Sequence, residues 1–126
     1  MGRPSDVVFV EPTHVMERYY RAADIYVLAS VREAHPVALL EAMACGLPCL
    51  ASRILGATDV MIEDGVNGRL VDCDDEAGLA AALDSVLSDR ETAARLGQRA
   101  REQAVARYDI RQTAALWFDA YQTVLR

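Results

Sequence analysis

The sequence has little of what marks several large classes of protein. Its 126 residues include three cysteines, two histidines, and 13 arginines and lysines against 19 aspartates and glutamates, a net charge of -6 at pH 7. Nucleic-acid affinity comes mainly from Lys and Arg that release counterions, so this balance argues against a nucleic-acid partner. An odd number of cysteines without paired spacing argues against a disulfide framework. So few cysteines and histidines also give no convincing metal cluster.

Long apolar runs are missing as well. Residues 1–12 contain no apolar stretch of signal-peptide length, and no later run approaches the roughly 18 residues that a membrane span needs. We therefore expect a cytoplasmic protein. With 52% hydrophobic and 25% charged residues, residues 1–126 suffice for a single domain with a core.

Short β-rich runs alternate with helical periods through the first 72 residues, which predicts an α/β fold. Strands are predicted at 7–10, 25–30, 49–52 and 69–72. Thr13 is placed to cap a first helix. The block 31–52, which is apolar almost all the way round, predicts a second helix from Pro36, as first helical residue, to Gly46.

Residues 73–126 have a helical pattern. The acidic cluster at 72–76 is typical of a helix N-terminus, and it lacks the Asp-x-Asp-x-Asp-Gly pattern of a calcium loop. The last helix carries an apolar stripe, which we interpret as packing surface rather than a cofactor site. The stripe consists of Ile110, Ala114, Trp117, Phe118, Tyr121 and Leu125.

Glu41 is the unusual residue of the apolar block, because a carboxylate is rarely buried without a partner. One explanation is a structural ion pair with an arginine such as Arg32 or Arg53. The other is a ligand, because ligands bind where a helix begins at the carboxyl end of a parallel strand.

The start of this helix suits a nucleotide-linked sugar. Free N–H groups of residues such as Val37 and Ala38 can bind an anion such as phosphate. Glu33 lies just before the helix and Glu41 about one and a half turns inside it, so both carboxylates can flank one crevice. There they can accept hydrogen bonds from paired hydroxyls, as an acidic residue does from a ribose in dinucleotide sites.

The run from Glu33 to Glu41, within EAHPVALLEAMACGLPCLAS, resembles the E-x7-E signature of the retaining GT-B glycosyltransferases of family 4, also called group 1. The upstream YYRAADIYVLAS and the downstream GATDVMIEDGVNGRLVDCDD have the order and spacing of that family. The resemblance implies an incomplete C-terminal, donor-binding domain of a GT-B fold, a Rossmann-like parallel sheet flanked by helices. Residues 7–72 would hold the alternating strands and helices, and residues 73–126 the C-terminal helices.

The family transfers a glycosyl group from a nucleotide-diphosphate sugar to an acceptor with retention, usually without a bound metal, in glycan biosynthesis and related pathways. The resemblance makes Glu33 the catalytic-site contact to the donor sugar and Glu41 the contact to the ribose. The segment between them would present backbone N–H groups to the diphosphate. It consists of Ala34, His35, Pro36, Val37 and Ala38, with His35 as a lining residue at most. Gly56 matches the second glycine of a Gly-Gly turn near the donor.

The chain departs from the family pattern at three positions. Ala34 and Leu55 stand where relatives have Gly, and Asp59 where a Glu is usual. The alternative is therefore a degenerate, non-catalytic interaction module derived from the same fold. A receiver-type signalling domain is excluded, because the strands at 7–10 and 25–30 do not end in a carboxylate cluster.

The resemblance leaves out the N-terminal domain, which would bind a glycan, lipid or small-molecule acceptor and provide any association with the inner membrane face. It also leaves out two strands of the donor domain. The strand at 7–10 would then pair with 25–30, find a partner chain or stay exposed. We expect marginal stability or self-association.

Overall fold

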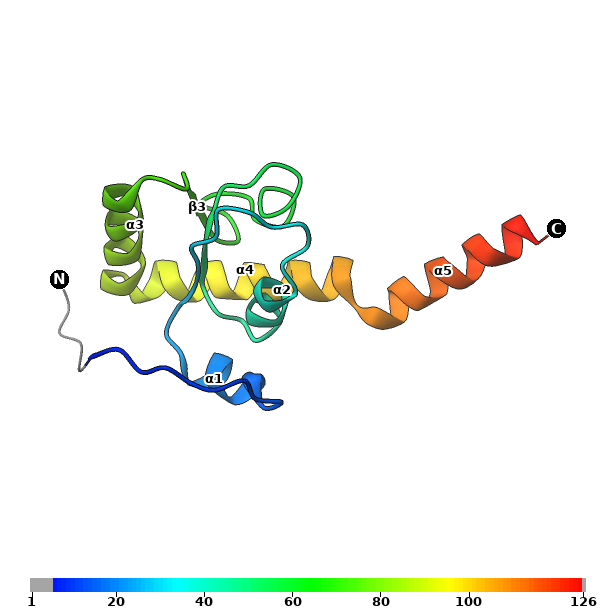
Figure 1. Cartoon of the computed structure of the whole chain (residues 1–126), viewed down its shortest axis with the longest axis horizontal. Coiled ribbons are helices and arrows are strands. Elements are labelled where there is room, and N and C mark those ends of the chain that lie inside the picture. Colours follow the sequence, from blue (N-terminus) through cyan, green and yellow to red (C-terminus); the bar gives the residue numbers. More distant parts are fainter. Residues whose placement is uncertain (1–5, 126) are drawn as a thin grey trace.

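The computed structural model describes residues 6–125 and has a parallel three-stranded sheet near its centre (Figure 1). The strand order is β1-β2-β3, with β1 at Tyr26–Leu28, β2 at Cys49–Ser52 and β3 at Arg69–Val71. The helices are α1 (Met16–Ala22), α2 (Val37–Ala44), α3 (Glu76–Ser88), α4 (Arg90–Tyr108) and α5 (Ile110–Val124). The predicted α/β class, with a parallel sheet and a helical C-terminal third, is confirmed.

The core lies around the middle strand. All four residues of β2 are buried, as expected of a parallel strand covered on both faces. Helices α2 and α4 pack against each other and against β2, and Leu39, Met43 and Ala100 are fully buried between them. Gly97 allows the close approach of α4, because a Cβ there would lie 2.1 Å from the carbonyl oxygen of Gly46.

The strand predictions are correct in number only in part. The strand at 49–52 is confirmed, and those at 25–30 and 69–72 are shortened to 26–28 and 69–71. The strand predicted at 7–10 is wrong: these residues are exposed and form no ladder in the described chain. A strand requires a hydrogen-bonded neighbour, and segment 7–10 has none beside it.

The first helix boundaries also differ from the predictions. Pro36 is the N-cap of α2 rather than its first helical residue, because its ψ of 90° is extended. Helix α2 therefore occupies only 37–44 of the apolar block. Gly46 ends it as predicted, with a φ of 79° that favours glycine. Helix α1 begins at Met16, so Thr13 does not cap it, although its hydroxyl accepts a hydrogen bond from the amide of Val15.

The C-terminal helices are placed as predicted, but one packing prediction fails. Asp75 caps α3 through a hydrogen bond from the amide of Gly78, which confirms the capping role of the acidic cluster. The apolar stripe on α5 does not pack within the described chain: none of its residues is buried, and α5 projects away from the body (Figure 1). The body ends with α4, so no other element lies within reach of the stripe.

Candidate functional site

The carboxyl ends of the three strands meet at one edge of the sheet. The strands are parallel, so their following segments emerge on the same side. The Cys73 thiol, two residues beyond β3, lies 3.7 Å from the carbonyl oxygen of Ser30 and 3.8 Å from that of Arg53. Ser30 follows β1 and Arg53 follows β2, so Cys73 connects all three strand ends. This is the edge at which open α/β sheets bind ligands.

Glu33 lies at this edge, in the segment between β1 and α2. The Ser30 hydroxyl donates a 2.7 Å hydrogen bond to its carboxylate, and Glu33 is half-buried. This bond fixes one oxygen of the carboxylate and leaves the other available to a ligand. Glu33 is therefore a held, partly accessible acceptor just before the N-terminus of α2.

Residues 34–38 lead from Glu33 into α2. Pro36 is buried, while Ala34, Val37 and Ala38 are exposed. The first hydrogen bonds of the helix run from the amides of Leu39 and Leu40 to the carbonyl of Pro36, at 3.1 and 3.3 Å. The amides of Val37 and Ala38 precede these bonds and lie in the first turn, where a helix favours anions.

His35 is turned toward the C-terminal helices rather than toward an acid. Its ring centroid lies 6.4 Å from that of Tyr108, at the end of α4. The Tyr108 hydroxyl in turn lies 3.5 Å from the carbonyl oxygen of Val60, to which it donates. This arrangement fits a lining residue better than a catalytic base.

Glu41 has a partner, but it is not an arginine. Its side chain is on the exposed side of α2, and the Tyr20 hydroxyl of α1 donates a 3.0 Å hydrogen bond to Oε2. Arg53, one of the two arginines considered for Glu41, lies 3.7 Å from Asp72 instead. Among residues 6–125, none of the ion pairs involves Glu41.

Two tyrosines lie between the carboxylates. The Tyr20 and Tyr26 rings meet edge to face, with their centroids 5.9 Å apart. Burial, followed by the hydrogen bond to Glu41, raises the pKa of Tyr20 to about 12. Burial also raises the pKa of Tyr26, with smaller contributions from Cys49, Glu33 and Glu41. Both glutamates thus act electrostatically on one phenol, so they lie on two sides of the same region.

A hollow beside Glu41 lies between α1 and α2. Its lining combines a carboxylate, a phenol, an imidazole and apolar atoms, a mixture that can accept hydrogen bonds from hydroxyls and contact a flat ring. The lining residues are His14, Met16, Glu17, Tyr20, Glu41, Ala44 and Cys45.

Gly56 follows β2 and has a φ of 76°, a conformation that favours glycine. Its amide donates a 2.7 Å hydrogen bond to the carboxylate of Asp59, and the neighbouring Leu55 is 93% exposed. Leu55 therefore points into solvent rather than filling the turn. Among residues 6–125 only glycines have positive φ, so Ala34 occupies its position without backbone strain.

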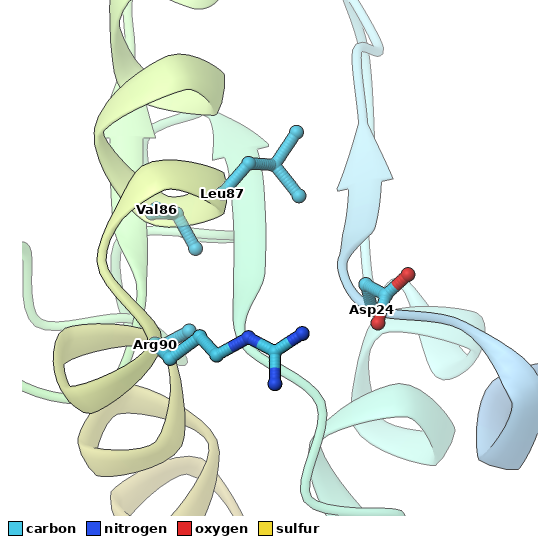
Figure 2. Close-up of a pocket in the computed structure, with 5 residues that line it drawn as sticks. Asp24, Val86, Leu87 and Arg90 are labelled. Atoms are coloured by element: carbon cyan, nitrogen blue, oxygen red, sulfur yellow. The ribbon is translucent and has the colours of Figure 1, made fainter.

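A separate hollow lies at the opposite edge of the sheet (Figure 2). It is lined by Val86 and Leu87 of α3, by Arg90 and Ala93 of α4, and by Asp24, which precedes β1. Figure 2 shows the Arg90 side chain extending toward Asp24. This hollow lies at the amino end of β1 and contains none of the predicted site residues.

Tyr20 and Ser30 are the site residues that the sequence analysis missed. Both donate a hydroxyl hydrogen bond to one of the two glutamates. Ser30 could have been found by its spacing of three residues from Glu33, which suits a local turn. Tyr20 lies 21 residues from Glu41, and only the packing of α1 on α2 brings the two together.

The fold and the arrangement of this edge are those of part of a GT-B glycosyltransferase. Sucrose-phosphate synthase from Thermosynechococcus elongatus superposes with a TM-score of 0.81 at 32% identity, over 85% of this chain and 27% of that one. The C-terminal domain of the group 1 glycosyltransferase LpcC from Francisella tularensis gives a TM-score of 0.73 at 31% identity, over 82% of this chain and 53% of that one.

The chain belongs to the family Glycosyl transferases group 1, whose model matches residues 6–103. N-acetyl-alpha-D-glucosaminyl L-malate synthase from Bacillus anthracis is 35% identical over 104 residues, 82% of this chain and 27% of that protein. The chain thus spans about a quarter of the length of this relative. Helix α5 lies beyond the matched family region.

Two further findings concern residues 6–125. No helix there is both long and apolar enough to cross a membrane. No three His, Cys, Asp or Glu side chains gather there as a group that could hold a metal ion.

Proposed function

We propose that the chain is the donor-binding part of a retaining glycosyltransferase that uses a nucleotide-diphosphate sugar. The observation that carries the proposal is the pair of glutamates on two sides of the start of α2. Glu33 is held by Ser30 and Glu41 by Tyr20, and each keeps acceptor capacity for a ligand hydroxyl. The exposed first turn of α2 lies between them.

Each part of this edge receives one part of the donor. Glu33 accepts hydrogen bonds from the sugar hydroxyls, and Glu41 accepts them from the ribose in the hollow between α1 and α2. The segment 34–38 offers its amides to the diphosphate. As the bond from the anomeric carbon to the diphosphate breaks, these donors stabilise the negative charge of the leaving nucleotide. The acceptor hydroxyl attacks the face that the diphosphate leaves, so the anomeric configuration is retained. The donor is a substrate, and we expect neither a cofactor nor a metal.

The acceptor enters from a segment that this chain does not contain. The chain spans about a quarter of its curated relative, so a further domain, in the same polypeptide or in a partner chain, would supply the acceptor site and any contact with the inner membrane face. We propose that the described residues bind donor but transfer no sugar alone.

A second candidate is an interaction module without catalytic function. It is favoured by the unpartnered apolar stripe on α5. The two candidates differ in whether the hollow beside Glu41 binds a nucleotide.

Nucleotide binding is tested by ligand-observed NMR with UDP, GDP, ADP and their common sugar conjugates. We expect saturable, weak binding of one nucleotide and at least a tenfold loss of affinity in Glu41→Ala. Glu63→Ala is the matched control, because Glu63 is exposed and far from the hollow, in the loop before β3. Loss of binding in both variants, or no binding of any nucleotide by the parent chain, would favour the interaction module.

Glu33→Gln separates the two carboxylates. If Glu33 contacts the sugar, this change weakens binding of the nucleotide sugar but leaves binding of the nucleotide diphosphate unchanged. Equal weakening of both ligands would contradict the assigned roles.

A further inference from the structure

Helix α5 presents a broad apolar surface that the described chain does not cover. Trp117, Phe118 and Tyr121 are 60 to 63% exposed, and four aliphatic residues extend the surface along the helix. The aliphatic residues are Ile110, Leu116, Val124 and Leu125. Isolated exposed apolar residues are ordinary, but a continuous stripe of this size marks an interaction site.

The surface contains a socket for a side chain of another helix. A hollow is lined by Thr113, Leu116, Trp117 and Ala120, which occupy positions i, i+3, i+4 and i+7 of α5. Four residues at this spacing form the hole that accepts one knob in helix-to-helix packing. Thr113 and Ala120 keep the hole wide because their side chains are small. The surface is therefore shaped for a helix rather than for a strand or a flat sheet.

The charges of α5 argue for a protein rather than a membrane as the occupant. The charged residues between 110 and 125 are Arg111 and Asp119, so this stretch has no net charge. Arg111 is also paired with Asp109 at 2.9 Å. Helices that lie on anionic membranes carry an excess of Lys and Arg on their polar face.

A second copy of the chain supplies matching knobs. Phe118 and Tyr121 lie on the same stripe as the hole, and the Trp117 and Tyr121 rings form a ridge with centroids 5.8 Å apart. Hole and knobs on one helix make the surface self-complementary, as a twofold interface requires. An antiparallel pair also keeps the two bodies, each part of a chain with a charge of -6, at opposite ends of the helix pair.

The exposed stripe is large enough for such a pair. Large aromatic side chains bury about 150 to 250 Å² each, so the stripe can bury on the order of 600 Å² per copy. Two copies would then bury about 1,200 Å², the lower end of the range for specific interfaces.

We propose that two copies of the chain associate through their α5 helices, with the knobs of each entering the hole of the other. Trp117 is the only tryptophan of the chain, so its fluorescence reports on this surface alone. The inference is independent of nucleotide binding.

The test combines sedimentation velocity with tryptophan fluorescence on the full chain between about 2 and 200 µM. We expect a concentration-dependent shift from monomer to dimer, accompanied by a blue shift of the Trp117 emission. Phe118→Glu should abolish both changes. Ala115→Glu is the matched control, because it adds the same charge on the opposite side of α5, and it should leave both changes intact.

Three results would overturn the proposal. The first is a monomer at every concentration, which would mean that another part of a longer polypeptide or another protein covers α5. The second is a dimer whose Trp117 emission stays that of an exposed indole, and the third is a Phe118→Glu variant that dimerises like the parent. Circular dichroism of the variant checks its helix content, and because α5 contributes no buried residue, the fold of the body should survive.

Discussion

At the scale of the residue, the hydrogen bond between Tyr20 and Glu41 ties α1 to α2. The phenol is 6% exposed and donates to a carboxylate that itself reaches solvent. The pair therefore favours the neutral phenol beside the charged carboxylate. It also holds one oxygen of Glu41 and leaves the other free.

The raised pKa of Tyr20 predicts a loss of stability at alkaline pH. Its pKa is about 12 in the folded chain, against an ordinary value near 10. The stabilisation is therefore complete below pH 10 and is lost as the pH rises through 12. We expect the urea midpoint to fall between pH 10 and 12, and to fall less in Tyr20→Phe. Tyr121→Phe, at an exposed phenol, should keep the dependence of the parent. An identical pH dependence in Tyr20→Phe would contradict this assignment.

The residues of the site were predictable to different degrees. The spacing of Glu33 and Glu41 and the resemblance around them identify two acceptors near one helix start. The orientation of a side chain depends on its tertiary neighbours, so the sequence gives no sign that Tyr20 reaches Glu41 or that His35 turns toward Tyr108. The roles of the two glutamates toward a donor remain predictions.

At the scale of the element, helix ends were more predictable than strands. Asp75 and Gly46 mark helix boundaries through local hydrogen bonding and backbone conformation, which depend on a few neighbouring residues. Segment 7–10 has a strand-like composition, but a strand also needs a neighbouring chain. The described residues provide none, and no local pattern could have revealed this.

The N-cap of α3 gives a measurable contribution to stability. The Asp75 carboxylate accepts a 2.8 Å hydrogen bond from the amide of Gly78. We expect Asp75→Ala to lower the free energy of unfolding by about 1 kcal/mol, because one amide of the first turn loses its partner. Asp74→Ala removes the same charge without removing the cap and should change little. Stabilisation of the parent chain by calcium chloride, measured in the same melts, would restore the calcium-loop explanation.

The packing of α4 on the turn after α2 depends on Gly97. A Cβ at this position would lie 2.1 Å from the carbonyl oxygen of Gly46 and 3.2 Å from the nitrogen of Pro48, both of them backbone atoms. We expect Gly97→Ala to destabilise the fold by about 1 to 3 kcal/mol through overpacking. This exceeds the roughly 1 kcal/mol by which Ala favours a helix over Gly.

Chemical denaturation measures the effect, with Gln98→Ala as the control on the exposed side of the same helix. A Gly97→Ala variant as stable as the parent would mean that α4 does not approach the turn this closely.

At the scale of the whole molecule, the chain is a compact body with three unfinished surfaces. β1 is an edge strand, segment 7–10 is exposed, and α5 carries an uncovered apolar stripe. The sequence predicted the apolar stripe but not its exposure, because amphipathic periodicity shows that a face is apolar and not what covers it. All three surfaces fit a chain that spans about a quarter of its relative.

These surfaces predict that thermal stability depends on protein concentration. Association through any of them stabilises the folded chain by mass action, so the melting temperature should rise by several degrees over a hundredfold increase in concentration. Phe118→Glu distinguishes the surfaces: loss of the dependence assigns it to α5, and a remaining dependence assigns it to β1 or segment 7–10. Differential scanning calorimetry at about 5 and 500 µM provides the measurement. A sharp monomeric transition at the same temperature in both samples would show that the core around β2 is sufficient to stabilise the chain alone.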